Sequence, residues 1–351
     1  MPRVVGIDPG TVSLDICGLD DGRLFLDATC PTPEAVADPE RLARAITASG
    51  PVDVVVGPSG YGLPLSAAAG VSEDDLRLAF LSRPGDSGGI GGIGRLARRL
   101  GETGLPLMFI PGVVHLDTVP RHRKINRIDL GTADKVAAAA LAIDEQSKRL
   151  GRELVDISLI LVELGGAFTA GIAVQRGQIV DGIGGTSGPI GWRSSGAWDG
   201  EVAFLAGEVT KAALFRGGVE TVLEHDPRER ETAIEAYVEG IARMIAQLLC
   251  AAPDADEIVL SGRMCDDSDI LHRLGERLGD VRRVQSLGGF ASVAKQGAQG
   301  AALIADGLAG GTHRGLVERL RLRSAAGTVL DHLHVITRAT ARSRLGLEPD
   351  A

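Results

Sequence analysis

The chain has 351 residues, with 46 Asp and Glu against 37 Lys and Arg, so its formal net charge is −9. This acidic balance disfavours non-specific binding to nucleic acid, and we expect no nucleic-acid partner. Aromatic residues make up only 3% of the chain. The core therefore has to be built from Val, Leu, Ile and Ala, as in α/β proteins.

The cysteine pattern and the lengths of the apolar runs indicate the compartment. The four cysteines lack CxxC spacing, which predicts free thiols (Cys17, Cys30, Cys250, Cys265). The chain begins directly with an apolar strand, without the charged-then-apolar pattern of a signal segment. No apolar run reaches the ~20 residues that spanning a bilayer requires. We therefore expect a cytoplasmic protein without a membrane partner.

The first twenty residues predict a β-hairpin with an acidic residue beside its turn. Val4–Ile7 is an apolar strand, Asp8-Pro9-Gly10-Thr11 forms the turn, and Ser13–Leu19 returns. Glycine allows a close approach of backbone to an anion, and turn amides can point at that anion. Since hard cations prefer carboxylate oxygens, this hairpin is a candidate site for a phosphate with a divalent metal.

Two further glycine-rich stretches follow. Val52–Val56 predicts a buried strand ending in the loop 57–62, at the sheet edge where α/β ligand sites usually form. Residues 89–94 then satisfy GxGxxG. A dinucleotide fingerprint needs a strand immediately before it and an acid about twenty residues later, but residues 83–87 intervene here. We expect instead a flexible glycine lid, with Arg95 and Arg98 able to meet an acidic ligand.

The middle of the chain carries a basic segment and a long helix. Residues 120–127, PRHRKINR, hold five basic side chains. They form either a solvated loop or a cluster that receives a carboxylate or phosphate. Thr132 is a predicted N-cap for an Ala-rich helix from Ala133 to Arg149.

A second hairpin repeats the design of the first. Leu159–Val162 is an apolar strand, Glu163 precedes the Gly165-Gly166 turn, and Gly171–Gln175 returns. Further on, a periodic helix (231–249) leads into a strand (257–260) that ends in Ser-Gly-Arg. The helix 294–308 carries Gly297 and Gly300, both predicted to face the Ala133–Arg149 helix. His332 and His334 are expected to be surface histidines, since no third metal ligand is evident.

Several motifs, in order along about three hundred residues, resemble one superfamily. The two hairpins resemble the phosphate loops of the acetate-and-sugar-kinase, heat-shock ATPase and actin superfamily. Four segments resemble its acetate/butyrate kinase branch, and the uncharacterised predicted butyrate kinases are the nearest group that we can name. These segments are GIDPGTVSLDI (6–16), PGVVHLDTVP (111–120), LGTADKV (130–136, against GTSHKYV) and GGTSGP (184–189).

The resemblance implies an α/β fold with two lobes. Each lobe of this actin-like, ribonuclease H-like fold is a mixed sheet flanked by helices, with a nucleotide cleft between the lobes. The implied N-terminal lobe spans 1–132 and the C-terminal lobe 133–310. Within the latter, 133–150 and 294–308 would be inter-lobe helices, and 311–351 an extension packing back on the core.

The resemblance also implies Mg²⁺ and ATP as cofactors and assigns residues to them. Phosphoryl transfer needs positioning and charge neutralisation more than a protein nucleophile. Asp8 and Glu163 would hold Mg²⁺. The other implied roles are β- and γ-phosphate binding (Gly10, Thr11, Ser13, Gly165, Gly166, Ala167), adenosine binding (Ser261, Gly262, Arg263), and charge neutralisation around a carboxylate acceptor (His115, Arg121, Arg123).

Two departures from the branch leave alternatives open. Asp134 stands where GTSHKYV has histidine, and Asp15 stands where close relatives commonly carry lysine. An ATP-dependent kinase of a short-chain carboxylate is the first expectation. A kinase of a hydroxyl-bearing metabolite, with Asp15 or Asp117 as base, is the second. The third is a nucleotide-gated binding module with vestigial turnover. The expected partners are the small-molecule acceptor and, as an option, a second copy of the chain.

Overall fold

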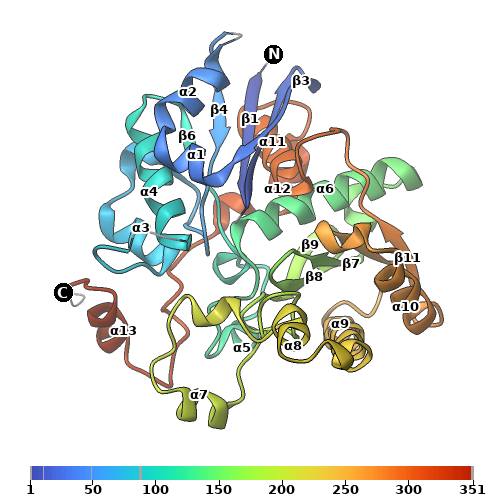
Figure 1. Cartoon of the computed structure of the whole chain (residues 1–351). Coiled ribbons are helices and arrows are strands. Elements are labelled where there is room, and N and C mark those ends of the chain that lie inside the picture. The colour runs from blue at the N-terminus through green and yellow to red at the C-terminus, as the bar shows by residue number, and fades with distance from the viewer. Residues whose placement is uncertain (1, 11, 49, 87–88, 349–351) are drawn as a thin grey trace. The chain divides into compact units, whose positions relative to one another are not determined.

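The chain forms two compact units in the computed structural model, which describes residues 2–10, 12–48, 50–86 and 89–348 (Figure 1). Unit 1 comprises residues 1–128, 132–155 and 288–351, and unit 2 comprises 129–131 and 156–287. The division predicted from sequence assigns 133–310 to the second lobe. The contacts group the helices near 133–150 and 294–308 with the N-terminal residues instead, because the helix near 294–308 packs on the first sheet and the helix near 133–150 packs on that helix.

Unit 1 contains a six-stranded mixed sheet in the order β3-β2-β1-β4-β6-β5. β1 and β2 form the predicted antiparallel hairpin, whereas β1, β4 and β6 are parallel. The carboxyl ends of these three parallel strands therefore share one sheet edge, which carries the turn at Gly10, the loop from Gly57 and the segment from Pro111. The strands are β1 (Arg3–Pro9), β2 (Ser13–Asp20), β3 (Arg23–Pro31), β4 (Val54–Val56), β5 (Ser66–Ala67) and β6 (Leu107–Phe109).

Helices cover both faces of this sheet (Figure 1). Val5 and Ile7 of β1 point into an apolar core that also contains side chains of α1 to α4. Gly6 faces the other way, onto α11, where an added Cβ would lie 2.2 Å from the Ala302 nitrogen. The helices are α1 (Thr32–Ala37), α2 (Pro39–Thr47), α3 (Glu73–Phe80), α4 (Gly89–Glu102), α5 (Arg121–Lys124), α6 (Ala133–Leu150), α11 (Gln296–Leu308), α12 (Arg314–Arg319) and α13 (Arg338–Arg344).

The GxGxxG stretch is helical, so the expectation of a flexible glycine lid is wrong. Residues 89–94 form the first part of α4. Leu96, Ala97 and Leu100 of the same helix are fully buried in the core of unit 1, and this burial outweighs the poor helix propensity of glycine. Arg98 forms a 2.6 Å ion pair with Glu73 of α3. The stretch therefore serves packing, which agrees with our rejection of a dinucleotide fingerprint.

The two Ala- and Gly-rich helices of unit 1 pack closely on one another. A Cβ added to Gly300 of α11 would lie only 1.8 Å from the Ala137 oxygen of α6, which confirms the predicted contact at that position. Gly297 does not face α6 but the carboxylate of Asp8, 2.4 Å from where its Cβ would lie. Thr132 is the N-cap of α6 as predicted, but its hydroxyl bonds the Asp134 carboxylate and caps no backbone amide.

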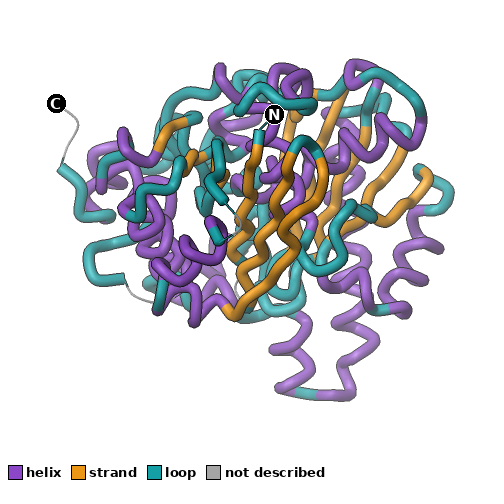
Figure 2. Tube along the Cα trace, turned by 90° about the horizontal axis from the view of Figure 1, so that it is seen from above, coloured by secondary structure: helices purple, strands orange, loops and turns teal. Residues whose placement is uncertain are grey.

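Unit 2 contains a five-stranded sheet that repeats the arrangement of the first. Its order is β11-β10-β7-β8-β9, with β7, β8 and β9 antiparallel and β10 and β11 parallel to β7. Both sheets thus combine an antiparallel meander of three strands with parallel strands beside the first of them; Figure 2 traces the strands in orange. The strands are β7 (Leu159–Leu164), β8 (Thr169–Gln175), β9 (Gln178–Ile183), β10 (Glu257–Ser261) and β11 (Arg283–Ser286).

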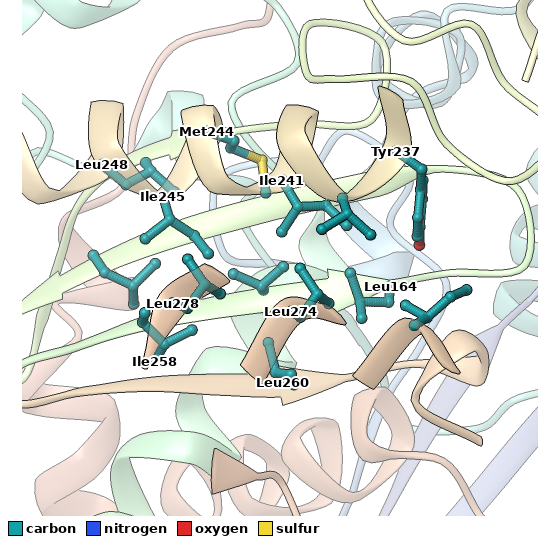
Figure 3. Close-up of a cluster of buried hydrophobic side chains, with 14 of the residues drawn as sticks. Leu164, Tyr237, Ile241, Met244, Ile245, Leu248, Ile258, Leu260, Leu274 and Leu278 are labelled. Atoms are coloured by element: carbon teal, nitrogen blue, oxygen red, sulfur yellow. The ribbon is translucent and has the colours of Figure 1, made fainter. Parts of the chain in front are cut away.

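The core of unit 2 is built by the long helix that the periodicity predicts. Tyr237, Ile241 and Leu248 of α9 are fully buried, and Figure 3 shows the apolar side chains of this helix directed at the strands and at α10. The helices of unit 2 are α7 (Gly200–Ala206), α8 (Val219–His225), α9 (Arg230–Ala251) and α10 (Ser268–Leu278). Within the described residues of both units, every helix is too short or too polar to cross a bilayer.

Candidate active site

The turn of the first hairpin places two carboxylates on one face of the sheet. Asp8 and Asp15 are directly opposite in the β1–β2 register, so their side chains project from the same face. That face is covered by the start of α11, where Gly297 lies against Asp8. Gly10 makes room for a tight turn, since a Cβ there would lie 2.6 Å from the Ser13 oxygen. Thr11, predicted to bind phosphate, lies outside the described residues.

A lysine that the sequence analysis missed lies over this turn. Lys295, the N-cap residue of α11, places its Nζ 3.1 Å from Asp15 Oδ2 and hydrogen-bonds Ser13 Oγ. Asp15 itself is buried, with 1% of its surface exposed. A buried carboxylate committed to a lysine and a hydroxyl is poorly placed to act as an open base. No local pattern could reveal Lys295, because it is 282 residues from Ser13.

Unit 2 brings the second hairpin and the Ser-Gly-Arg motif together, as the predicted roles require. β7 and β10 are parallel, and Glu163 is in register with Ser261. Gly262 has φ +95°, and a Cβ there would lie 2.6 Å from the Leu164 oxygen. Arg263 Cδ is 3.5 Å from where a Cβ of Gly166 would be. Both adjacent strands therefore end in glycine turns at one sheet edge, which lets backbone amides approach a ligand.

The remaining members of this turn also have defined environments. Gly165 donates a 3.0 Å hydrogen bond to the Phe168 oxygen, which closes the turn. The buried Ala167 accepts hydrogen bonds at its carbonyl from the amides of Arg193 and Ser194, at 3.1 and 3.0 Å. The Ser261 hydroxyl is buried without a hydrogen-bond partner among the described residues. Because an unpartnered buried hydroxyl is costly, Ser261 is a candidate contact for a ligand.

Asp129 organises the GGTSGP loop of unit 2. Its Oδ2 accepts hydrogen bonds from the amide and the hydroxyl of Thr186, both at 2.9 Å, and its carbonyl accepts one from Ser187 Oγ at 2.6 Å. A Cβ on Gly184 would lie 1.7 Å from Asp129 Oδ1, so this position needs glycine. The sequence analysis missed Asp129, because its partners lie 57 and 58 residues away.

A pocket of about 160 Å³ in unit 1 holds His115. His115 ends the 3-10 turn η2 (Val113–His115), which follows the parallel strand β6. The loop after β4 contributes Gly62 and Leu63, and residues 327–329 close the pocket from the C-terminal segment. The full lining is Gly62, Leu63, Pro64, Ser66, Gly70, Val71, Asp75, Leu78, His115, Gly327, Thr328 and Val329.

His115 is neutral at physiological pH, which does not support the positive charge expected of it. The residue is buried, with 3% exposed, and its Nδ1 has no hydrogen-bond partner within the described structure. Burial lowers the pKa of His115 to about 4, against the opposing effect of a hydrogen bond to Gly112, and the nearby Lys124 ammonium lowers it further by a smaller amount. The imidazole can therefore offer a hydrogen bond to a ligand but no charge.

The burial of His115 predicts that folding stability depends on pH. The unfolded chain titrates this histidine near its ordinary value of 6.5, and the folded protein near 4. The contribution of His115 to the free energy of unfolding is therefore fully present above pH 6.5 and is lost as the pH falls towards 4. The free energy of unfolding should fall by about 2 kcal/mol between pH 7 and pH 5 from this residue. Urea unfolding at both pH values should show this loss, and His115→Gln should remove it. The exposed His272 is the control, since His272→Gln should leave the loss intact.

The basic segment does not line this pocket. Lys124 is buried and donates a 2.7 Å hydrogen bond to the Leu116 carbonyl, and burial lowers its pKa. Arg121 and Arg123 belong to the short helix α5 and are not among the lining residues. Their predicted role toward an acceptor therefore has no support from the geometry of the pocket.

The other two acids weighed in the sequence analysis have cationic partners. Both carboxylate oxygens of Asp117 are bonded by Arg321, which argues against a free base at that position. Burial disfavours ionisation of Asp134, but the adjacent Lys135 ammonium and hydrogen bonds from Lys135 and Thr132 hold its pKa below the usual value. Asp134 is therefore an ionised partner of Lys135.

The predicted Mg²⁺ ligands are two carboxylates on different units, Asp8 in unit 1 and Glu163 in unit 2. Within the described residues, no group of three or more His, Cys, Asp or Glu side chains is close enough to hold a metal ion. Mg²⁺ usually keeps several waters and takes only one or two carboxylates in phosphate-binding proteins, so the donors fit that ion. The assignment itself stays a prediction.

Comparison with known structures shows which fold these units form. The chain is similar to a propionate kinase from Francisella tularensis subsp. tularensis SCHU S4, with TM-score 0.57, 12% identity, and coverage of 86% of this chain and 99% of that one. It is also similar to an acetate kinase from Entamoeba histolytica, with TM-score 0.55, 12% identity, and coverage of 80% of this chain and 87% of that one. An acetate kinase from Porphyromonas gingivalis matches with TM-score 0.54, 12% identity, and coverage of 85% of this chain and 94% of that one. The α/β fold of two mixed sheets flanked by helices is thus shared with these acetate and propionate kinases.

At the level of sequence, no curated protein matches the chain. One protein family does match, over residues 6–335, and its description is "Protein of unknown function (DUF1464)". This match covers both hairpins, the pocket around His115 and the turn that Lys295 overlies. The chain therefore belongs to the DUF1464 family.

Proposed function

We propose that this protein is a kinase that transfers the γ-phosphoryl group of Mg·ATP directly to a small acceptor. The observation that carries the proposal is the repeated hairpin. In each unit, a strand with an acid near its carboxyl end leads into a glycine turn, at the sheet edge where α/β proteins bind ligands (Asp8 and Gly10, Glu163 and Gly165). The likeness in fold to acetate and propionate kinases supports the same reaction class.

We propose that the nucleotide is bound by the residues that the sequence resemblance assigns to it. Asp8 and Glu163 would hold Mg²⁺, which supplies charge neutralisation for the phosphates when it is bound. Gly10 and Ser13 of unit 1 and the 165–167 turn of unit 2 would contact the β- and γ-phosphates. The Ser261-Gly262-Arg263 turn would lie against the adenosine, with the unpartnered Ser261 hydroxyl available to it.

We propose a short-chain carboxylic acid as the acceptor, bound in the pocket of His115. The pocket is similar in volume to a cavity that holds benzene, which is the size class of a C3–C6 acid. Leu63, Val71 and Leu78 provide an apolar lining for an alkyl chain. The hydroxyls of Ser66 and Thr328 also line the pocket, and they donate to the Pro64 carbonyl and the Asp331 carboxylate. Neutral His115 could donate a hydrogen bond to the carboxylate from a tautomer protonated on Nδ1.

A hydroxyl-bearing acceptor is the second candidate, because one carboxylate lines the same pocket. Asp75 Oδ2 caps α3 by accepting from the Ser72 amide and hydroxyl, whereas Oδ1 accepts no described hydrogen bond. A carboxylate in this position would repel an anionic acceptor and could take a proton from a hydroxyl. Asp75 replaces Asp15 and Asp117 as the candidate base, since those two are paired with Lys295 and Arg321.

Trapping the product distinguishes the acceptors. Purified protein with Mg·ATP and C2–C6 acids is expected to give an acyl phosphate that hydroxylamine captures as a hydroxamate. ADP release with polyols or sugars but without hydroxamate would identify a hydroxyl kinase, and Asp75→Asn should then abolish turnover. Nucleotide binding without transfer to any acceptor in either panel would reject the kinase and leave the nucleotide-gated module.

A further inference from the structure

We infer that Lys295 is a binding residue for the β- and γ-phosphates of the nucleotide, supplied to the first hairpin from the start of α11. This inference rests on the proposed function and adds to it a cationic residue in unit 1. The ammonium of Lys295 bonds Ser13 Oγ, lies 3.1 Å from Asp15 Oδ2, and is 3.9 Å from the position of a Cβ on Gly10. It therefore overlies the turn that should contact the phosphates.

The charge of this turn requires a cation. Asp8 and Asp15 project from the same face of the β1–β2 hairpin, so the turn would present two carboxylates to a polyphosphate. Asp15 is buried and its contact with Lys295 neutralises its charge, while Asp8 is the carboxylate of this turn that we assign to the metal ion. Half of the Lys295 side chain is exposed (49%), and one of its three N–H donors remains after the bonds to Ser13 and Asp15. That donor can bind a phosphate oxygen.

The segment before Lys295 is held by three side chains, so the lysine is pre-positioned. Glu145 of α6 accepts from the amides of residues 288 and 289, and Gln299 of α11 accepts from those of residues 290 and 291. Asp27 of β3 accepts from the amides of residues 292, 293 and 294, at 2.7 to 3.2 Å. These bonds, the one from Ala294 foremost, hold the pKa of Asp27 below its usual value.

Seven consecutive amides, 288 to 294, are thus bound by side chains from three elements of unit 1. The residue that follows is Lys295. A loop held in this way loses little conformational entropy when its lysine binds an anion, which increases affinity. This role explains why three polar side chains bind the backbone of a surface loop that belongs to no strand or helix.

The test is isothermal titration of wild type and variants with ATP, ADP and AMP in the presence of Mg²⁺. Lys295→Met is expected to weaken ATP and ADP binding by about tenfold to a hundredfold, the effect of losing one charge-assisted hydrogen bond. AMP binding should be unchanged, because AMP lacks both outer phosphates. Lys295→Arg should retain most of the affinity. Lys148→Met, at an exposed lysine paired with Asp144 on α6, is the matched control and should bind all three nucleotides normally.

A double variant separates phosphate binding from neutralisation of Asp15. Asp15→Asn/Lys295→Met removes both charges, so no buried carboxylate is left unpaired. It should bind ATP as weakly as Lys295→Met if the lysine contacts phosphate. Recovery of wild-type affinity in the double variant, or ATP affinity within twofold of wild type in Lys295→Met, would overturn the inference. Wild-type protein that binds ATP but transfers nothing would reject only the kinase, and wild-type protein that binds no nucleotide would reject both.

Discussion

Asp8→Asn is expected to remove most of the metal-dependent stabilisation that ATP gives to this protein. Mg·ATP at a hundredfold excess over its Kd should raise the free energy of unfolding by ~2.7 kcal/mol. Asparagine keeps the shape of the side chain but loses the charge that a hard cation prefers. Turnover should fall by about a hundredfold or more, as when one strong electrostatic contact to the reacting phosphoryl group is lost. Thermal unfolding with and without Mg·ATP measures the first effect.

The control for Asp8→Asn is the same substitution at a turn remote from the proposed site. Asp21 is exposed, with φ +52°, a backbone conformation that asparagine tolerates well. Asp21→Asn should therefore keep its stability and its full response to Mg·ATP. ATP in the presence of a chelator should bind wild type and Asp8→Asn equally, because the difference comes from the metal. An Asp8→Asn protein with the full Mg·ATP response would remove Asp8 from the proposed metal site.

Gly300→Ala is expected to destabilise unit 1 by about 3 kcal/mol, the upper end of the usual cost of overpacking. The added methyl would lie 1.8 Å from the Ala137 oxygen, a backbone atom of α6 that no rotamer change can move. The two helices would have to separate, which would open the contact between α6 and α11. Urea unfolding followed by circular dichroism measures the loss.

The same substitution at another helical glycine of unit 1 is the matched control. Gly315 in α12 is exposed, and an added Cβ there meets nothing within 4 Å. Gly315→Ala should leave the free energy of unfolding unchanged or raise it by up to ~1 kcal/mol, because alanine restricts the unfolded chain. Equal stabilities of Gly300→Ala and Gly315→Ala would contradict the close packing of α6 and α11.

Local signals in the sequence were enough to predict both hairpins and the long helices. Apolar β-branched runs next to glycine turns indicate strands that reverse, and β1–β2 and β7–β8 form as expected. The Ala-rich pattern from Ala133 and the periodic pattern from Glu231 likewise give α6 and α9. The Ser-Gly-Arg turn lies beside the second hairpin, because β10, which follows the helices α7 to α9, pairs in parallel with β7, the first strand of the antiparallel meander. The hairpins and the long helices depend on residues that are near each other in the chain.

Tertiary structure decided what local patterns could not. Residues 89–94 are helical because burial of α4 on the core outweighs the glycine propensity that suggests a loop. The positive charge expected of His115 is absent because the depth of its pocket, rather than its residue type, determines its pKa. Lys295 meets Ser13 and Asp15 only after sheet order and helix packing bring together residues that are 282 positions apart, as Ser13 and Lys295 are. Charge partners and burial are properties of the folded chain, and for this protein they determine which acids remain available for chemistry.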